Sequence, residues 1–169
     1  MIRVPEMITE RSQPASARTL YPPSNIAAAL GRVRAQTFNL YAKTKRLLWQ
    51  MCGSDFHEYR HVLEEQAEQL LTLTDAITAC MCNLGGMDVR PIDHSDLSRR
   101  SIGGNVEFVA SEDVLTDLRV DNQILAGSLR SAQALCQKRG DIVAASLIDV
   151  WIDETRRRAW LLFEMIHSV

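Results

Sequence analysis

The sequence predicts an all-α protein that folds as one four-helix bundle with a single long crossover connection. Four segments carry apolar residues three or four positions apart, the interval that gathers them on one face of a helix. No segment alternates apolar and polar residues with a period of two, so no β-strand is expected. The first and third connections are short and predict antiparallel hairpins, whereas residues 87–110 form a long crossover between the second and third helices.

The bundle is expected to occupy residues 24–169, after an irregular tail at residues 1–23. A chain of 169 residues is long enough for one domain with its own core. In the tail, prolines recur among Ser, Thr, Glu and Arg, a composition that disfavours regular secondary structure.

The first two helices have recognisable start and stop residues. Ser24 can cap the first helix, and Gly53 ends it. Ser54 or Asp55 can cap the second, and Gly85–Gly86 stops it. Their predicted inward residues share the helical interval and are Ile26, Leu30, Val33, Thr37, Leu40, Thr44, Leu47, Met51, Phe56, Tyr59, Leu63, Ala67, Leu70, Ile77, Met81 and Leu84.

The crossover and the last two helices can be predicted from the same kinds of start, stop and spacing residues. Residues 95–100 predict a short helix within the crossover. The third long helix is expected to begin at Ser111 and to end at Gly140, and Asp141 is expected to cap the fourth. The predicted inward residues of these two helices are Val114, Leu118, Leu125, Leu129, Leu135, Ile142, Ala145, Ile148, Ile152, Ala159, Leu162 and Ile166.

Composition excludes several classes of function. A net charge of −2 and a pI near 6.1 give no basic footprint for nucleic acid. Arg3, Arg11 and Arg18 in the tail are too dispersed for a polybasic arm, so DNA binding is expected to be weak or absent. No apolar leader or membrane-spanning run is present, and four cysteines without a CxxC pair predict reduced thiols. These features predict a cytoplasmic protein.

The stretch from Thr44 to Gly86 carries the most specific pattern in the chain. Its frame residues are Thr44, Lys45, Trp49, Gly53, Phe56, Asp75, Leu84, Gly85 and Gly86. Their spacing resembles the Dps family (DNA protection during starvation), which belongs to the ferritin-like proteins, and the likeness extends over residues 20–167. The resemblance implies a ferritin-like bundle in a homo-oligomeric cage of twelve subunits. It also implies iron(II) oxidation by peroxide at the two-fold interface, iron storage and protection from oxidative stress.

The resemblance also locates the family's iron ligands and indicates that most are replaced. Two histidine positions correspond to Leu48 and Arg60, and a glutamate position corresponds to Ala79. The two carboxylate positions that remain are Glu64, in place of the usual aspartate, and Asp75. Three of five expected ligands are therefore replaced, which leaves open whether the chain is a ferroxidase.

Helix geometry restricts what Glu64 and Asp75 can do. They are eleven residues apart, roughly 16 Å along a helix, so one ion cannot bridge them within a chain. They converge only if two copies of the second helix pair antiparallel across a two-fold axis. Iron(II) favours imidazole with carboxylate, and Arg60 stands one turn before Glu64, where it can neutralise that carboxylate. A weak cation site and a structural salt bridge are both open interpretations.

His57 to His61 match the His-Glu-x-x-His motif of zinc proteases. A protease is disfavoured, because that site needs a third distal ligand and a site-forming domain. At 100° per residue, these two histidines fall on one helical stripe with Glu64, Glu68 and Asp75, opposite the apolar face. The stripe is open to three interpretations: a solvated surface, an interface patch, or a relocated metal site with His57, His61, Glu64 and Asp75 as candidate ligands.

Two further groups carry structural expectations. Trp49, Trp151 and Trp160 are expected to anchor packing, because aromatic side chains are usually buried. The basic run at residues 156–158 is expected to be a solvated face that pairs with Asp153 and Glu154.

The predicted function is therefore a Dps-like cage protein, linked to iron binding or storage and to stress protection, with an impaired ferroxidase site. The alternative is a non-catalytic structural cage subunit or scaffold that co-assembles with an active paralogue. A DNA-compacting cage is disfavoured by the charge.

Overall fold

A computed structural model of the chain describes residues 25–50, 57–85 and 111–167. Across these residues the chain is helical and contains no strand, which confirms the predicted all-α four-helix bundle. The helices are α1 (Asn25–Gln50), α2 (His57–Asn83), α4 (Ser111–Lys138) and α5 (Ile142–His167). The predicted tail, the crossover helix and the caps at Ser24, Gly53 and Ser54 or Asp55 lie outside the described residues. None of the described helices combines the length and the apolar character that a membrane crossing requires.

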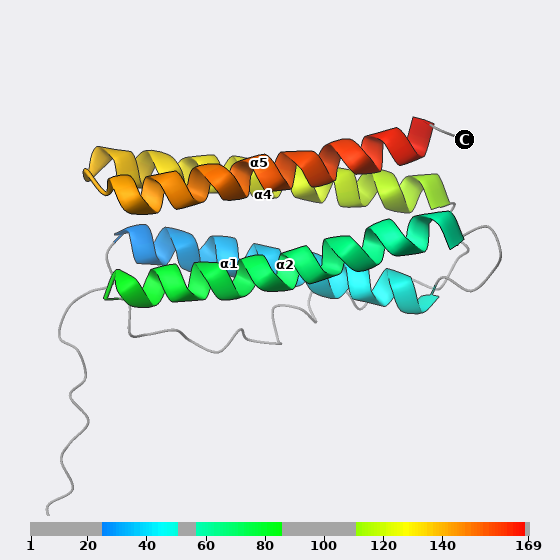
Figure 1. Cartoon of the computed structure of the whole chain (residues 1–169), viewed down its shortest axis with the longest axis horizontal. Coiled ribbons are helices and arrows are strands. Elements are labelled where there is room, and N and C mark those ends of the chain that lie inside the picture. The colour runs from blue at the N-terminus through cyan, green and yellow to red at the C-terminus, as the bar shows by residue number, and fades with distance from the viewer. Residues whose placement is uncertain (1–24, 51–56, 86–110, 168–169) are drawn as a thin grey trace, which may run out of the picture.

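The bundle consists of two antiparallel hairpins stacked on one another (Figure 1). Helix α1 packs along α2, and α4 packs along α5. The hairpins meet mainly where α1 contacts α4, whereas α2 and α5 lie side by side with fewer close approaches. The exposed face of α2 is therefore a side of the bundle that no other described helix covers.

The core is built mainly from the predicted apolar stripes, but at the start of α4 it contains Leu115 instead of the predicted Val114, which is only half-buried. Its largest fully buried apolar side chains are Leu30, Val33, Leu63, Leu70, Ile77, Leu115, Leu118, Leu125, Leu129, Ile148 and Leu162. The prediction was wrong for Ile142, which is exposed. Ile142 is the first residue of α5, directly after the chain reverses, so its side chain lies at the end of the hairpin instead of along the seam.

The turn between α4 and α5 confirms the predicted stop at Gly140 and cap at Asp141. Gly140 has φ of 75°, a conformation that favours glycine. Its N–H donates to the Gln137 carbonyl at 3.0 Å, and the Asp141 N–H donates to the Cys136 carbonyl at 3.0 Å. The Asp141 carboxylate then accepts from the Ala144 N–H at 3.0 Å, which caps α5.

We expect Gly140→Ala to lower the free energy of unfolding by about 1–2 kcal/mol, because an L-residue is strained at this positive φ. Gly127→Ala is the matched control. Gly127 lies inside α4 and an added Cβ there meets nothing within 4 Å, so it should stabilise by about 0.5–1 kcal/mol. Urea unfolding at one fixed protein concentration measures both. Equal effects of the two substitutions would contradict this account of the turn.

Candidate functional site

The exposed face of α2 carries the predicted metal ligands. The helix places Leu63, Leu70 and Ile77 in the core, and this phase turns Glu64 and Asp75 to the exterior. His61 is exposed as well, whereas the side chain of His57 lies outside the described part of the chain. The predicted separation of this stripe from the apolar face is confirmed for the described side chains.

Glu64 is held by the residue one turn before it. The Arg60 Nε donates to Glu64 Oε1 at 3.0 Å, and each side chain is 53% exposed. This confirms the expected pairing of the two residues. An exposed pair of this kind contributes little to stability, but the guanidinium neutralises one of the two carboxylates that are predicted as metal ligands.

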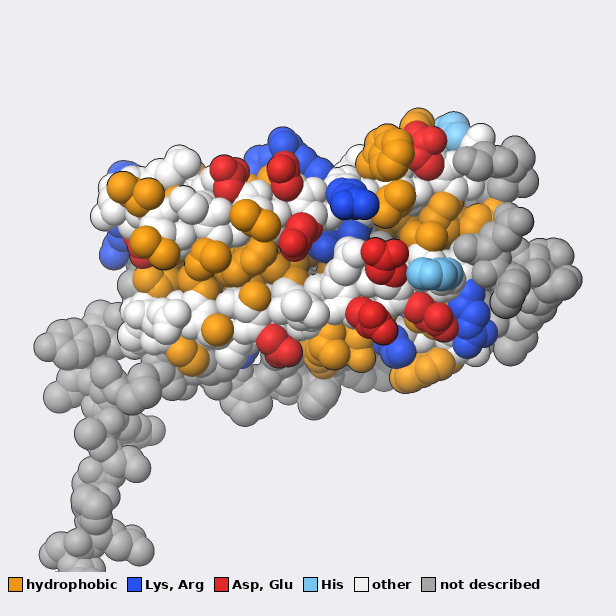
Figure 2. All heavy atoms as spheres, in the orientation of Figure 1, with side chains coloured by type: hydrophobic (Ala, Val, Ile, Leu, Met, Phe, Trp, Pro, Cys, Tyr) orange, Lys and Arg blue, Asp and Glu red, His pale blue; other side chains and the backbone are white. Residues whose placement is uncertain are grey.

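The described part of a single chain contains no group of three or more His, Cys, Asp or Glu side chains that could hold a metal ion. Acidic side chains are spread along the face formed by α2 and α5, and several of them lie near a histidine toward one end (Figure 2). Glu64 and Asp75 are eleven residues apart on α2 and do not share a site with each other within the described part of one chain. Glu64, Asp75, His57 and His61 therefore remain predicted ligands.

Leu48 and Ala79, the positions at which the resemblance predicts lost ligands, have no side-chain donor atoms for iron. The Leu48 side chain is 5% exposed and belongs to the apolar core. Ala79 is exposed and presents only a methyl group. Iron(II) sites use imidazole and carboxylate ligands, so neither position can contribute to one.

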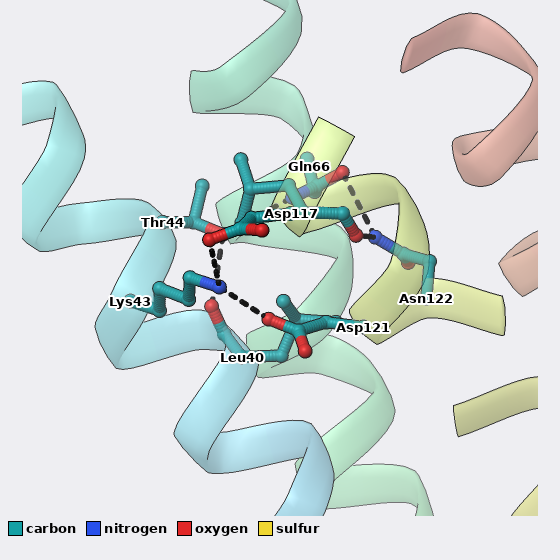
Figure 3. A network of polar contacts seen from close by, with 8 residues as sticks. Leu40, Lys43, Thr44, Gln66, Asp117, Asp121 and Asn122 are labelled. Carbon is teal, nitrogen blue, oxygen red and sulfur yellow. Dashed lines mark hydrogen bonds and ion pairs between the residues drawn. The ribbon is translucent and has the colours of Figure 1, made fainter. Parts of the chain in front are cut away.

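A buried polar network crosses the bundle, and the sequence analysis did not identify it (Figure 3). The Thr44 hydroxyl donates to the Leu40 carbonyl at 2.8 Å and accepts from Gln66 Nε2 at 3.0 Å. Asn122 Nδ2 donates to Gln66 Oε1 at 3.4 Å and to the Leu118 carbonyl at 2.9 Å. The network thereby links α1, α2 and α4 through side chains that have no contact with solvent or almost none.

Arg158 extends the network to α5. Its Nε donates to Asn122 Oδ1 at 3.2 Å, and its Nη2 donates to Thr155 Oγ1 at 2.8 Å. The side chain is 3% exposed, and burial lowers the pKa of Arg158 to about 10. Its Nη1 has no hydrogen-bond partner. Holding this charge inside the bundle is costly, because no carboxylate contacts the guanidinium among the described residues.

The prediction of a solvated basic run at residues 156–158 was therefore wrong for Arg158. Arg158 lies three residues after Thr155 and seven after Trp151, both buried, so helical phase carries it inward. The helical spacing from Trp151 and Thr155 could have predicted this burial. The two exposed arginines directly before Arg158 instead suggested a basic surface run.

The side chains of this network determine whether a metal ion could bind inside the bundle at this level. Ferritin-like di-iron proteins with an intra-bundle site project carboxylates and histidines inward from all four helices. Here the four helices contribute Thr44, Gln66, Asn122 and Arg158 at this level. Neutral amides, a hydroxyl and a guanidinium do not fit a cation, so the donor set inside the bundle is wrong for iron.

An ion pair borders this network. Lys43 Nζ lies 2.6 Å from Asp121 Oδ2 and 3.9 Å from Asp117 Oδ2, which joins α1 to α4 (Figure 3). Both aspartates are thus engaged by a lysine ammonium and act as structural residues.

The tryptophans divide between the core and the surface. Trp151 is buried and confirms its predicted packing role, but Trp49 is 74% exposed and Trp160 is 57% exposed. The prediction was wrong for these two within a single chain, because helical phase turns both side chains away from the bundle. Cys80 and Cys136 are buried, and burial raises the pKa of each thiol.

The chain matches a known protein family over most of its length. Residues 27–168 match the Ferritin family, described as a ferritin-like domain. Because the match spans most of the chain, this protein belongs to the ferritin-like family. No curated protein sequence matches the chain.

Solved structures of Dps proteins share the fold. DpsC from Streptomyces coelicolor is 24% identical, with a TM-score of 0.73, and the alignment covers 85% of this chain and 83% of that one. The H31G Dps mutant of Listeria innocua is 13% identical, with a TM-score of 0.75 over 87% and 96% of the two chains. A Vibrio cholerae O1 Dps protein, described as a member of a superfamily of ferritin-like diiron-carboxylate proteins, is 20% identical, with a TM-score of 0.72 over 83% and 88%. The expected ferritin-like family and bundle fold are confirmed.

Proposed function

We propose that this chain is a Dps-type cage subunit that takes part in iron binding or storage and in oxidative-stress protection, in the cytoplasm, and that its inter-subunit ferroxidase step is impaired. One observation carries the proposal. The Arg60 guanidinium occupies the Glu64 carboxylate on the exposed face of α2, where the Dps resemblance expects a histidine beside a free carboxylate.

Charge explains the expected impairment. In iron oxidation by peroxide, each of two iron(II) ions gives one electron to the peroxide, so the site must hold two cationic substrates together. An arginine close to the site repels them, because like charges a few ångströms apart oppose one another strongly near a protein surface. Across a two-fold axis, Glu64 of one chain and Asp75 of the other would be the only ligands left from the expected set.

An apolar patch at the start of α5 supports the oligomeric part of the proposal. Ile142, Val143, Leu147 and Val150 are exposed on this half of the helix. Exposed apolar residues that gather in this way mark protein–protein contact surfaces. The patch fits a homo-oligomer, and we propose the twelve-subunit cage that the Dps resemblance implies.

Two measurements on the full-length protein test the proposal. Native mass measurement should give a twelve-subunit assembly, and a stable monomer would refute the cage. The assembled protein is then loaded anaerobically with iron(II) and mixed with peroxide while ferric absorbance is followed. We expect no rate above the buffer control, and a rate that rises with protein concentration would show that the ferroxidase step is intact. A gel shift at low salt should show weak retardation of DNA or none.

A non-catalytic subunit that co-assembles with an active paralogue is the second candidate function. It is favoured by the combination of lost ligand positions, Leu48 and Ala79, with an exposed apolar patch on α5. Refolding the chain together with an active Dps protein separates the two candidates. Mixed assemblies in native mass spectra support co-assembly, whereas assemblies of one chain type only support the homo-oligomeric cage.

A further inference from the structure

A groove of about 370 Å³ runs between α4 and α5, away from the exposed face of α2. Its floor is formed by Asn122, Ala126 and Ala159, which are all buried. One alanine from each helix lines the groove, and the small side chains leave space that larger ones would fill. A volume of this size is at the lower end of the range for small-molecule sites.

Three arginines line this groove. Arg119 and Arg130 come from α4, and Arg156 comes from α5. No aspartate or glutamate lines the groove, and none of the three guanidiniums forms an ion pair with another described residue. Guanidinium groups match the geometry of phosphate oxygens and can bind them through two parallel N–H donors. The groove therefore has the chemistry of an oxyanion site in a chain whose net charge is negative.

Aromatic side chains lie among these arginines. Trp160 lines the groove and is exposed, so one face of its indole is open to a ligand. The Arg119 guanidinium lies over the Phe163 ring, with its Cζ 4.5 Å from the ring centroid. Exposed aromatic rings beside cations are the usual platform for stacking a nucleobase.

The helix register divides the groove into two ends. Arg119 of α4 faces Phe163 of α5, which fixes the alignment of the two antiparallel helices. Seven residues further along in each direction, Arg156 faces Ala126, one helical turn from Arg130. Arg130 and Arg156 thus lie toward the same end of the groove, and Trp160 lies one turn from Arg156.

We propose that this groove binds a small aromatic phosphate of the nucleotide class, with the phosphates on Arg130 and Arg156 and the base against Trp160. Duplex DNA fits less well, because three cations within one narrow groove engage few of the phosphates from which a duplex draws its affinity.

Calorimetric titration of the full-length, assembled protein tests the proposal, in buffer free of phosphate and sulfate. The probes are ADP, pyrophosphate, adenosine and a short DNA duplex. ADP should bind more tightly than pyrophosphate, and adenosine should bind weakly or not at all. Arg130→Gln and Arg156→Gln should each weaken ADP binding about tenfold, the effect of losing one charge-assisted hydrogen bond. Arg157→Gln is the matched control, since Arg157 is exposed on α5 and does not line the groove.

Trp160→Ala separates the aromatic part of the site from the ionic part. It should weaken ADP binding about fivefold or more and leave pyrophosphate binding unchanged. The proposal is wrong if ADP does not bind, if Arg157→Gln weakens binding as much as Arg156→Gln, or if only the duplex binds. If ADP does not bind, the mass of the assembled variants shows what the groove does instead. A lower assembly mass for Arg130→Gln and Arg156→Gln would mean that the groove contacts a second copy of the chain.

Discussion

Asn122→Leu is expected to destabilise the bundle by about 3–4 kcal/mol, a large effect for one substitution. Asn122 is fully buried and is the only described residue whose side chain bonds to both Gln66 and Arg158. Leucine removes the acceptor of Arg158 Nε and the donor to Gln66 Oε1. A buried guanidinium without its partner carries most of the expected penalty, because its charge stays out of water with less compensation.

The effect should be smaller when the charge itself is removed. Arg158→Met should destabilise by about 1–2 kcal/mol. It leaves Asn122 Oδ1 without a donor, but it also removes a charge that is costly to bury, as the lowered pKa of Arg158 indicates. The double variant with Asn122→Leu should lose about 2 kcal/mol, less than the sum of the single effects. The coupling energy is therefore expected to be about 2–4 kcal/mol.

Urea unfolding of the four proteins at one fixed concentration gives this double-mutant cycle, and the fixed concentration keeps assembly from shifting the apparent stability. Asn39→Leu is the control, because Asn39 is exposed on α1 and a surface change there should stay within about 0.5 kcal/mol. Additive effects in the cycle would show that Asn122 and Arg158 do not act as one network.

The sequence was sufficient for the bundle because apolar periodicity and turn residues act locally. Leu63, Leu70 and Ile77 lie where the 3.6-residue period places them, and Gly140 stops α4 by its own backbone conformation. Arg158 follows the same helical period but was missed, because an arginine is usually exposed and the amide that accepts from it lies on another helix. The groove between α4 and α5 likewise arises only when the two helices pack together and bring Ala126 and Ala159 to the same groove.

The candidate iron site was predictable only as far as a single helix determines it. The Arg60–Glu64 pair follows from a four-residue spacing. Whether Glu64 meets Asp75 depends on a second chain, which neither the periodicity of one chain nor its fold contains. A variant that restores ligands on α2 therefore tests the predicted pairing directly.

Arg60→His combined with Ala79→Glu is expected to raise the initial rate of peroxide-dependent iron(II) oxidation by at least about tenfold over the wild-type protein. A partner that only orients a metal ligand is already worth that factor in metal affinity or activity. Both positions are exposed, so the fold should tolerate the changes. The change frees Glu64 from its guanidinium partner and places a carboxylate one turn after Asp75. If two α2 helices pair antiparallel across a two-fold axis, one imidazole and three carboxylates then meet at each site, a donor set that suits iron(II).

Arg60→Gln combined with Ala79→Gln is the matched control, because it removes the same guanidinium and adds a side chain of similar size without a metal ligand. Anaerobic calorimetry with iron(II) measures binding separately from turnover, and native mass measurement confirms that each variant assembles. We expect the His/Glu variant alone to gain tight iron(II) binding and the faster ferric absorbance. If both variants assemble and neither gains binding, Glu64 and Asp75 do not converge across a two-fold axis. If both gain equally, the loss of the Arg60 charge accounts for the change and the positions aligned with the lost ligands are not ligand positions.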